Sequence, residues 1–475
     1  MFDPDIAPSG SLLGLLQRGR GDGTLHALAA PRAEALSALH HCVLRDPRRD
    51  WQVENRSLYY ARLCMELDGG LEEIEQHLFH PDDLIDTAEE RTGLTLAVLG
   101  HLASYGRDDA LHLLRRYAAT GGNWQWALDE LALRDDDSGL RALSGLVLAR
   151  FPRTPEGEAR LAAVARDAFE PRPWRLWAED TAEPENAARV RAALENGCFD
   201  RWQRQLRPAG PRPGWSVREV LEWAQQGLDA HPTQHRHGPA ARCLTAVAGP
   251  EDLPEVIAAA ADGPDAARAT ALRYLAEQHA PEALGLIEAA ADAPSTLVAD
   301  AAIAAFERMR STAALARARS WARRDDALGV AAAALLARRG GPHDTTAVLG
   351  TLRRVVRTEG PDAPALWELV DGAGRLAIGC AAPVLRHIYR ETSSSHLRGR
   401  AARALAATDP TFPAGFAVEC LWDCEESTRE LAARHAATAD SRVVERLRSL
   451  AADPAEEAEV QTAVRSRIDP DTASL

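Results

Sequence analysis

The sequence predicts an all-α fold built from repeated helix pairs, and three observations support this prediction. Apolar residues make up 46% of the 475-residue chain, whereas aromatic residues make up only 5%. Ala and Leu dominate the apolar set, which favours helices because strands prefer β-branched and aromatic residues. A unit of about 30 residues recurs in the C-terminal half, and the alternation of apolar and polar residues typical of a strand is missing there.

The repeat is clearest where successive units open at Pro250, Pro281, Ser311 and Pro342, which are 31, 30 and 31 residues apart. Each unit consists of an apolar helix of about three turns, a short break, and a second helix with small residues at i, i+3, i+4 and i+7. A proline suits the first turn of a helix, and an acidic residue such as Asp325 can cap the second helix. Because one pair cannot bury its apolar face alone, the units are expected to stack.

The same spacing resumes at Pro383 and Pro413, and a last pair after Asp440 has a charged outer face that suits a terminal cap. These units resemble HEAT repeats, in particular the bacterial HEAT-like type of phycobilisome-lyase relatives, in strings such as HLRGRAARALAA and DDALGVAAAALLA. The resemblance covers residues 240–470 and implies an α-solenoid of HEAT-like helix pairs. It does not imply one function, because the superfamily includes scaffolds, adaptors and a few enzymes.

Three segments are expected along the chain. Residues 1–165 are predicted to form a degenerate HEAT-like helical array, and residues 240–475 a regular array with a C-terminal cap. Residues 166–239 are predicted to be an irregular Trp/Pro-rich insert or linker, because prolines break helices there. This segment also holds five of the chain's eleven tryptophans, too many for a plain linker, which is polar and small.

Composition excludes several classes of function. The chain has no lysine, which rules out Schiff-base catalysis, a P-loop and a protein kinase. The net charge of −15 (55 basic against 70 acidic residues) makes nucleic acid an unlikely partner and favours a protein or peptide partner that is itself basic. Seven scattered cysteines, no signal-peptide pattern and no apolar run of ~20 residues predict a cytoplasmic protein that does not enter a membrane.

Two clusters contain residue types that ligate metals, but plainer interpretations are preferred for both, and no cofactor is expected. One cluster comprises His231, His235, His237 and Cys243. Imidazole and thiolate ligate zinc, but this spacing matches no standard zinc finger, so a solvated loop is preferred. Cys420 and Cys424 are one helical turn apart, where core packing is the preferred interpretation.

No catalytic motif is evident, and one enzymatic resemblance was weighed. The His-Glu pairs of HEAT-like di-iron hydroxylases are missing, and nothing singles out the chromophore pocket of a bilin lyase. HEAT-like alkylpurine DNA glycosylases hold a damaged nucleotide with tryptophans and an acidic residue, a set that Trp124, Trp126 and Asp129 resemble. Trp124 and Trp126 are two residues apart, however, so on a helix they are expected to point about 160° away from each other.

The favoured function is therefore a non-enzymatic scaffold or adaptor that binds a protein or peptide through a concave, acidic surface built by the second helix of each pair. The alternative is an enzyme, or an enzyme accessory, acting on a small molecule or modified base. A deep pocket with convergent His, Asp and Trp favours the alternative, whereas an open acidic groove favours the scaffold. No catalytic residue is assigned. The candidate binding residues, chosen as aromatic anchors, are Trp174, Trp177, Trp215, Trp223, Trp124 and Trp126.

Overall fold

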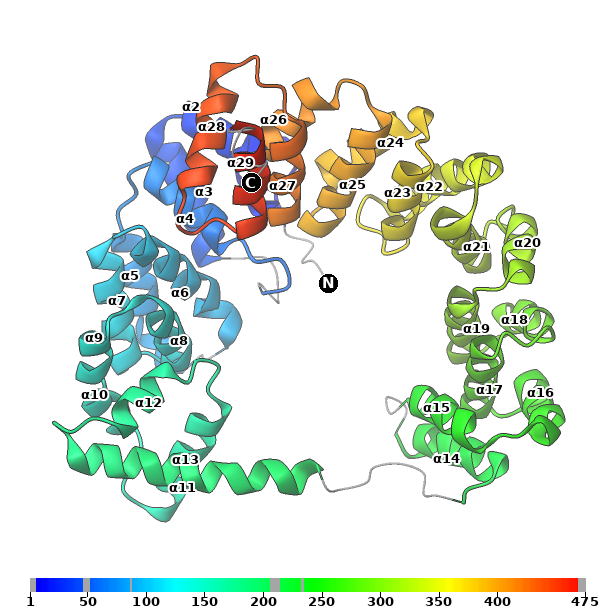
Figure 1. The fold of residues 1–475 in the computed structure, drawn as a ribbon, viewed down its shortest axis with the longest axis horizontal. Coiled ribbons are helices and arrows are strands. Elements are labelled where there is room, and N and C mark those ends of the chain that lie inside the picture. Colours follow the sequence, from blue (N-terminus) through cyan, green and yellow to red (C-terminus); the bar gives the residue numbers. More distant parts are fainter. Residues whose placement is uncertain (1–5, 46–51, 86–87, 206–213, 232–234, 469–475) are drawn as a thin grey trace. The chain divides into compact units, whose positions relative to one another are not determined.

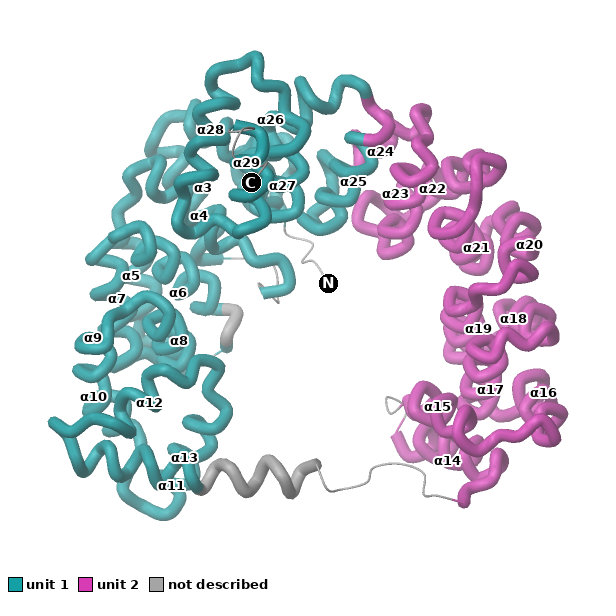
Figure 2. The backbone as a smooth tube through the Cα atoms, viewed as in Figure 1, with its two compact units in different colours: residues 1–207, 389–406, 410–475 teal, residues 208–388, 407–409 magenta. Residues whose placement is uncertain are grey.

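A computed structural model describes residues 6–45, 52–85, 88–205, 214–231 and 235–468. Every regular element in these ranges is a helix, which confirms the predicted all-α class for this part of the chain. The chain divides into two compact units (Figure 2). The first comprises residues 1–207, 389–406 and 410–475, and the second comprises residues 208–388 and 407–409.

The second unit is a succession of helix pairs (Figure 1). The pairs are α14 (Val217–Ala230) with α15 (His237–Val247), α16 (Leu253–Asp262) with α17 (Asp265–Glu277), α18 (Ala283–Ala291) with α19 (Thr296–Arg308), α20 (Thr312–Trp321) with α21 (Ala327–Arg339), and α22 (Thr345–Glu359) with α23 (Leu366–Arg375). Second helices pack on each other in order, α15 on α17, α17 on α19, α19 on α21 and α21 on α23. Their alanines explain this contact, since small side chains let helix backbones approach closely.

The helix pairs begin with the predicted prolines, but the acidic residue that caps α21 lies one position later than predicted. Short 3₁₀ turns at Pro250–Asp252 and Pro342–Asp344 precede α16 and α22. The cap of α21 is Asp326, whose carboxylate accepts the amide of Gly329 at 2.9 Å, and not Asp325 as the sequence predicts. Asp325 instead pairs with Arg354 on α22, so it links neighbouring pairs.

The first unit begins with shorter and less regular helices. They are α1 (Leu12–Gln17), α2 (Gly21–Ala29), α3 (Arg32–Leu44), α4 (Ser57–Glu66), α5 (Glu72–Leu78), α6 (Glu89–Ser104), α7 (Asp108–Thr120), α8 (Trp124–Arg134), α9 (Asp137–Ala142), α10 (Ser144–Leu148), α11 (Pro155–Asp167), α12 (Arg172–Ala178) and α13 (Pro184–Gln205). One apolar core runs from α1 to α13. The predicted insert therefore supplies α12 and α13 to the first unit and α14 to the second.

The same unit contains the last helices of the chain, α25 (Ser395–Thr408), α26 (Phe416–Cys420), α27 (Glu426–His435), α28 (Ser441–Ala452) and α29 (Ala458–Ile468). Helix α24 (Ala382–Glu391) crosses the boundary between the units. Each predicted segment is one continuous stretch of sequence, whereas the first compact unit combines residues from both ends of the chain. We call the contact between its early helices (α1–α4) and its late helices (α25–α29) the junction.

Two buried ion pairs lie at the junction, and their arginines also donate hydrogen bonds across it. Arg398, which is fully buried, donates to Asp423 at 2.8 and 2.9 Å and to the carbonyl of Gly19 at 3.3 Å. Arg56, also fully buried, donates to Glu54 and to the carbonyl of Ser393, both at 3.0 Å. Burial alone raises the pKa of Glu54, but the charge of Arg56 and further hydrogen bonds bring this pKa below its usual value. Each buried charge is thus neutralised by a partner from its own end of the chain, and hydrogen bonds such as Arg56 to Ser393 and Arg398 to Gly19 connect the two ends.

Close backbone contact at the junction depends on two glycines between α1 and α2. The amide of Cys424 donates to the carbonyl of Gly19 at 2.9 Å, and Gly19 has a φ of +66°. A Cβ on Gly21 would lie 1.8 Å from the carbonyl oxygen of Glu419. A larger residue at either position would therefore force the two backbones apart.

The last helix pair also takes part in the junction. Arg62 on α4 donates to Asp453 at 2.8 Å and to Glu456 at 3.0 Å, and Tyr105 donates to Asp453 at 3.1 Å. Glu456 is additionally paired with Arg429 on α27 at 2.7 Å. The acidic residues that the sequence assigns to the outer face of a cap thus bind a helix from the other end of the chain.

Candidate functional site

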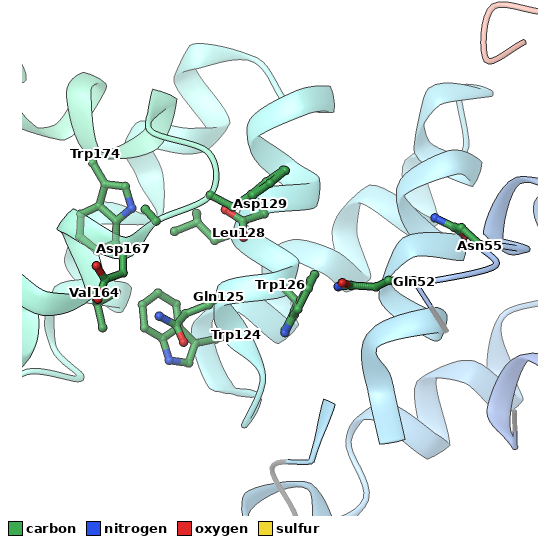
Figure 3. Close-up of a pocket in the computed structure, with 12 residues that line it drawn as sticks. Gln52, Asn55, Trp124, Gln125, Trp126, Leu128, Asp129, Val164, Asp167 and Trp174 are labelled. Carbon is green, nitrogen blue, oxygen red and sulfur yellow. The ribbon is translucent and has the colours of Figure 1, made fainter. Parts of the chain in front are cut away.

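A pocket of about 520 Å³ lies in the first unit over the start of α8 (Figure 3). Its size is within the range of ~300–1,000 Å³ typical of small-ligand sites. It is lined by Gln52, Asn55, Trp124, Gln125, Trp126, Leu128, Asp129, Val164, Asp167, Ala168, Phe169 and Trp174. Three of the six predicted binding residues, and the acidic residue of the weighed enzymatic resemblance, are therefore brought together.

A buried carboxylate fixes the start of α8. Asp83, 3% exposed, accepts the hydroxyl of Tyr117 at 2.5 Å and the amide of Gly122 at 2.6 Å. The side chain of Asn123 donates to the hydroxyl of Thr92 at 2.7 Å. These bonds set the turn between α7 and α8, and so they place the first residue of α8, Trp124.

Trp124 and Trp126 both line this pocket, although a spacing of two residues is expected to point side chains about 160° apart on a helix. The angular argument applies to the middle of a helix, but these residues lie in the first turn of α8. Cα–Cβ bonds lean toward the N-terminus of a helix, so large side chains from several directions can reach the space around that end. Trp124 is held from behind by Phe151, at 6.0 Å between ring centroids, and by Arg150, whose guanidinium carbon lies 5.4 Å from its ring.

Helix α12 contributes a third tryptophan. Trp174 is 2% exposed, and its ring packs edge-on against Trp177 at 5.0 Å between centroids. Trp177 is fully buried and donates its indole N–H to the carbonyl of Leu140 at 2.8 Å. Arg172 ties the start of α12 to the end of α8 through the carbonyl of Ala132 at 2.7 Å. Trp177 thus lies in the core behind Trp174 and offers no surface to a ligand in this conformation.

The loop between α11 and α12 adds Phe169, which sequence reasoning did not single out. Its ring lines the pocket yet is 82% exposed, which is unusual for an aromatic side chain. The amide of the next residue, Glu170, donates to the carboxylate of Asp129 at 3.2 Å and so anchors this loop to α8. Gln52 and Asn55, which precede α4, add amide groups to the pocket. The one sequence signal for Phe169 is that a large apolar residue stands in a proline-containing loop.

Asp129 is the most perturbed acidic group of the pocket. Burial raises its pKa to about 6, with a further contribution from the nearby Glu170 carboxylate, although the Glu170 amide acts in the opposite direction. Among the described residues, Asp129 forms no ion pair. Asp167 adds a second carboxylate, which is bonded to Arg166 at 2.9 Å.

Among the described residues that line the pocket, none is an arginine or a histidine. The N-terminal end of α8 adds the small positive partial charge of a helix dipole, and Arg166 balances the charge of Asp167, which leaves the carboxylate of Asp129 as the main charge of the described lining. The pocket is therefore aromatic and negatively charged.

The remaining predicted binding residues lie in the second unit and do not line this pocket. Trp215 and Trp223 are half-buried and pack edge-on at 6.3 Å between centroids. The guanidinium carbon of Arg236 lies 5.2 Å from the ring of Trp223. Both tryptophans therefore keep some surface, and an arginine already covers part of one.

The two cysteines of the predicted core pair contact other side chains. Cys420 is fully buried and lies 3.2 Å from the hydroxyl of Tyr389, whereas Cys424 accepts from Arg398 at 3.4 Å. His235 and His237 have ring centroids 5.9 Å apart. Across the residues that the structure describes, no three His, Cys, Asp or Glu side chains are grouped so that they could hold a metal ion.

The second helices of the second unit end in a basic hollow. A space of about 900 Å³ at the ends of α17, α19 and α21 is lined by His279, Arg308, Arg310, Arg338 and Arg339 together with Glu277 and Glu307. Cations there oppose the negative end of each helix dipole. The sequence predicts an acidic surface on the second helices, whereas this hollow at their ends is lined mainly by cations.

No protein-family model matches the chain, and neither a curated protein nor a solved structure matches it. Within the described residues, no helix is both long enough and apolar enough to cross a membrane.

Proposed function

We propose that the chain is a non-enzymatic binding protein of the HEAT-like solenoid type, and that its pocket accepts an arginine side chain from a basic protein or peptide. The stacked helix pairs of about 30 residues support the solenoid assignment. The single observation that carries the ligand assignment is the unpaired Asp129 carboxylate in a pocket lined by Trp124, Trp126 and Phe169.

A guanidinium group matches this pocket in two ways. Its flat face stacks on an aromatic ring, an attraction worth about 0.5–2 kcal/mol that is strongest on tryptophan. Its N–H groups donate to a carboxylate, and a charged hydrogen bond of this kind contributes about 1.5–3 kcal/mol. Arginine, unlike lysine, supplies both interactions from one planar group. The amides of Gln52 and Asn55 can bind the backbone of the same peptide.

The unfavourable burial of Asp129 supports a role in binding. Because burial raises the pKa of this carboxylate without a cation nearby, its charge opposes folding at neutral pH. A group that lowers stability and faces a pocket is a candidate functional residue. A bound cation would relieve the unfavourable burial.

A second candidate function rests on the same convergence of Trp124, Trp126, Trp174 and Asp129. A purine alkylated on its ring is planar and positively charged, so it suits aromatic walls and a carboxylate as an arginine does. This would make the chain an enzyme of the HEAT-like alkylpurine DNA glycosylase type, although its net charge of −15 opposes binding to DNA. Release of 7-methylguanine from methylated duplex DNA is the direct test of this candidate.

The proposed function is tested with a charged probe and its neutral isostere. The full chain is titrated with acetyl-arginine amide and, separately, with acetyl-citrulline amide, and binding is followed by tryptophan fluorescence and calorimetry. We expect the arginine probe to bind at least tenfold more tightly, because citrulline keeps the shape and loses the charge. Equal affinities would contradict the proposal.

Two variants locate the binding. Asp129→Asn and Trp126→Ala should each weaken binding of the arginine probe at least tenfold. Asp108→Asn, which removes an exposed carboxylate on α7, is the matched control and should change the affinity less than twofold. Wild-type affinity in both pocket variants would show that arginine binds elsewhere.

A further inference from the structure

The second unit contains an apolar groove that the proposed function does not use. The groove has a volume of about 610 Å³ and runs between α14 and α16, above the start of α17. Its apolar lining is made by Leu221, Ala258, Ala259, Pro264 and Ala267. Helix α14 packs on α15 and α17, and the side chain of Gln225 accepts the amide of Ala266 at 2.9 Å. This contact fixes the floor of the groove.

The edges of the groove, unlike its apolar floor, are acidic. Glu222 and Asp229 project from α14, and Glu255 and Asp262 from α16, so each edge carries two carboxylates. Among the described lining residues Arg218 is the one cation, and it pairs with Glu255 at 3.4 Å. The groove thus has an apolar floor and a net charge of −3, from four carboxylates and one arginine.

The spacing of the lining residues matches a helical ligand. Those from α14 extend from Arg218 to Asp229 at successive helical turns, a length of about 16 Å at 1.5 Å per residue. Ala258 and Ala259 on the facing helix are small, so a helix can approach closely and fill the groove with its own larger side chains. Three turns of helix would occupy this length.

From the apolar floor and the acidic edges, we infer that the groove binds a basic amphipathic helix of a partner protein. Its leucine-like side chains at i, i+3, i+4 and i+7 fill the floor, and its lysines or arginines lie along the carboxylates of Glu222, Asp229, Glu255 and Asp262. Charge complementarity selects this occupant over an acidic helix and accelerates its association. The site is independent of the pocket in the first unit, since the two share no residue.

The probe is an 18-residue capped peptide with leucine on one helical face and lysine elsewhere, titrated against the full chain at 0.15 M salt. Two control peptides are used: the same pattern with glutamate replacing lysine, and the same composition with its leucines rearranged so that no apolar face forms. We expect the first peptide to bind at least tenfold more tightly than either control. An equal affinity for either control would overturn the inference.

Matched variants assign the binding to the groove. Neutralising the four edge carboxylates (E222Q, D229N, E255Q and D262N) should weaken binding at least tenfold, and so should Ala258→Arg. The controls neutralise four exposed carboxylates elsewhere in the unit (E282Q, D300N, E307Q and E359Q) or place an arginine at exposed Ala313, and they should change the affinity less than twofold.

Three outcomes would overturn the inference: an equal loss in the four-carboxylate control, wild-type affinity in Ala258→Arg, or a dimer that Ala258→Arg dissociates, since the occupant would then be a second copy. Circular dichroism confirms that each variant is folded. Asp129→Asn should leave binding of this peptide unchanged, so failure here is distinguishable from failure of the proposed function.

Discussion

Removing the guanidinium of Arg398 should destabilise the junction strongly. Arg398→Met leaves Asp423 buried with the amide of Glu425 as its remaining donor, at 2.9 Å. Burial alone lowers the pKa of Arg398, but Asp423 more than reverses this, so the two charges depend on each other. Removal of one partner from a buried pair typically costs about 3–5 kcal/mol, whereas replacement of both by apolar residues is often neutral. We therefore expect Arg398→Met/Asp423→Leu to be more stable than Arg398→Met.

Hydrogen exchange at the amide of Cys424 reports this loss directly. That amide donates to the carbonyl of Gly19 across the junction, so its protection measures the free energy of opening. A loss of about 3–5 kcal/mol corresponds to exchange roughly 10²–10⁴-fold faster. Arg434→Ala, which removes an i,i+4 pair at the surface, is the control, with an expected change of about 0.3–0.5 kcal/mol. A change below about 1 kcal/mol in Arg398→Met would refute the reasoning.

Three further predictions follow from the pocket and the last helix pair. Binding of acetyl-arginine amide should strengthen as pH rises through about 6, because the pKa of Asp129 is raised to about 6 and its carboxyl group is neutral at lower pH. A pH-independent affinity between pH 5 and 8 would exclude this role of Asp129. Trp177→Ala should cost about 3–5 kcal/mol in denaturant unfolding because it empties a fully buried site, whereas half-buried Trp126→Ala should cost less and reduce binding; the reverse order would contradict the assignment. Deletion of residues 440–475 should lower the thermal midpoint, because it removes the acidic partners of Arg62 on α4, and an unchanged midpoint would show that this contact contributes no stability.

The regular part of the fold could be predicted because its signal is local. Successive prolines about 30 residues apart, with alanines at helical spacing between them, define the pairs from α16 to α21. The one-residue shift of the cap from Asp325 to Asp326 is a limit of local reasoning, since two adjacent carboxylates compete for the same helix end.

The junction and most of the pocket could not be predicted in this way. Arg56 bonds to the carbonyl of Ser393, 337 residues away, and no periodicity in the sequence relates residues so distant. The pocket gathers side chains from α8, α11 and α12 and from the loops before α4 and after α11. Sequence reasoning identified Trp124, Trp126 and Trp174 separately, but it could not place them in one pocket because that depends on how short, irregular helices pack.

The junction joins residues that the ribosome synthesises at very different times. Arg62 emerges early in synthesis, whereas its partners Asp453 and Glu456 follow almost 400 residues later. At ~5–20 residues per second, this delay is roughly 20–80 seconds. Throughout that interval the early helices are made but lack the partners that neutralise their buried charges, while the second unit, which depends on nearby contacts, can form. The nascent chain therefore completes its middle before its beginning, and its early helices are the segment most exposed to aggregation and to chaperones.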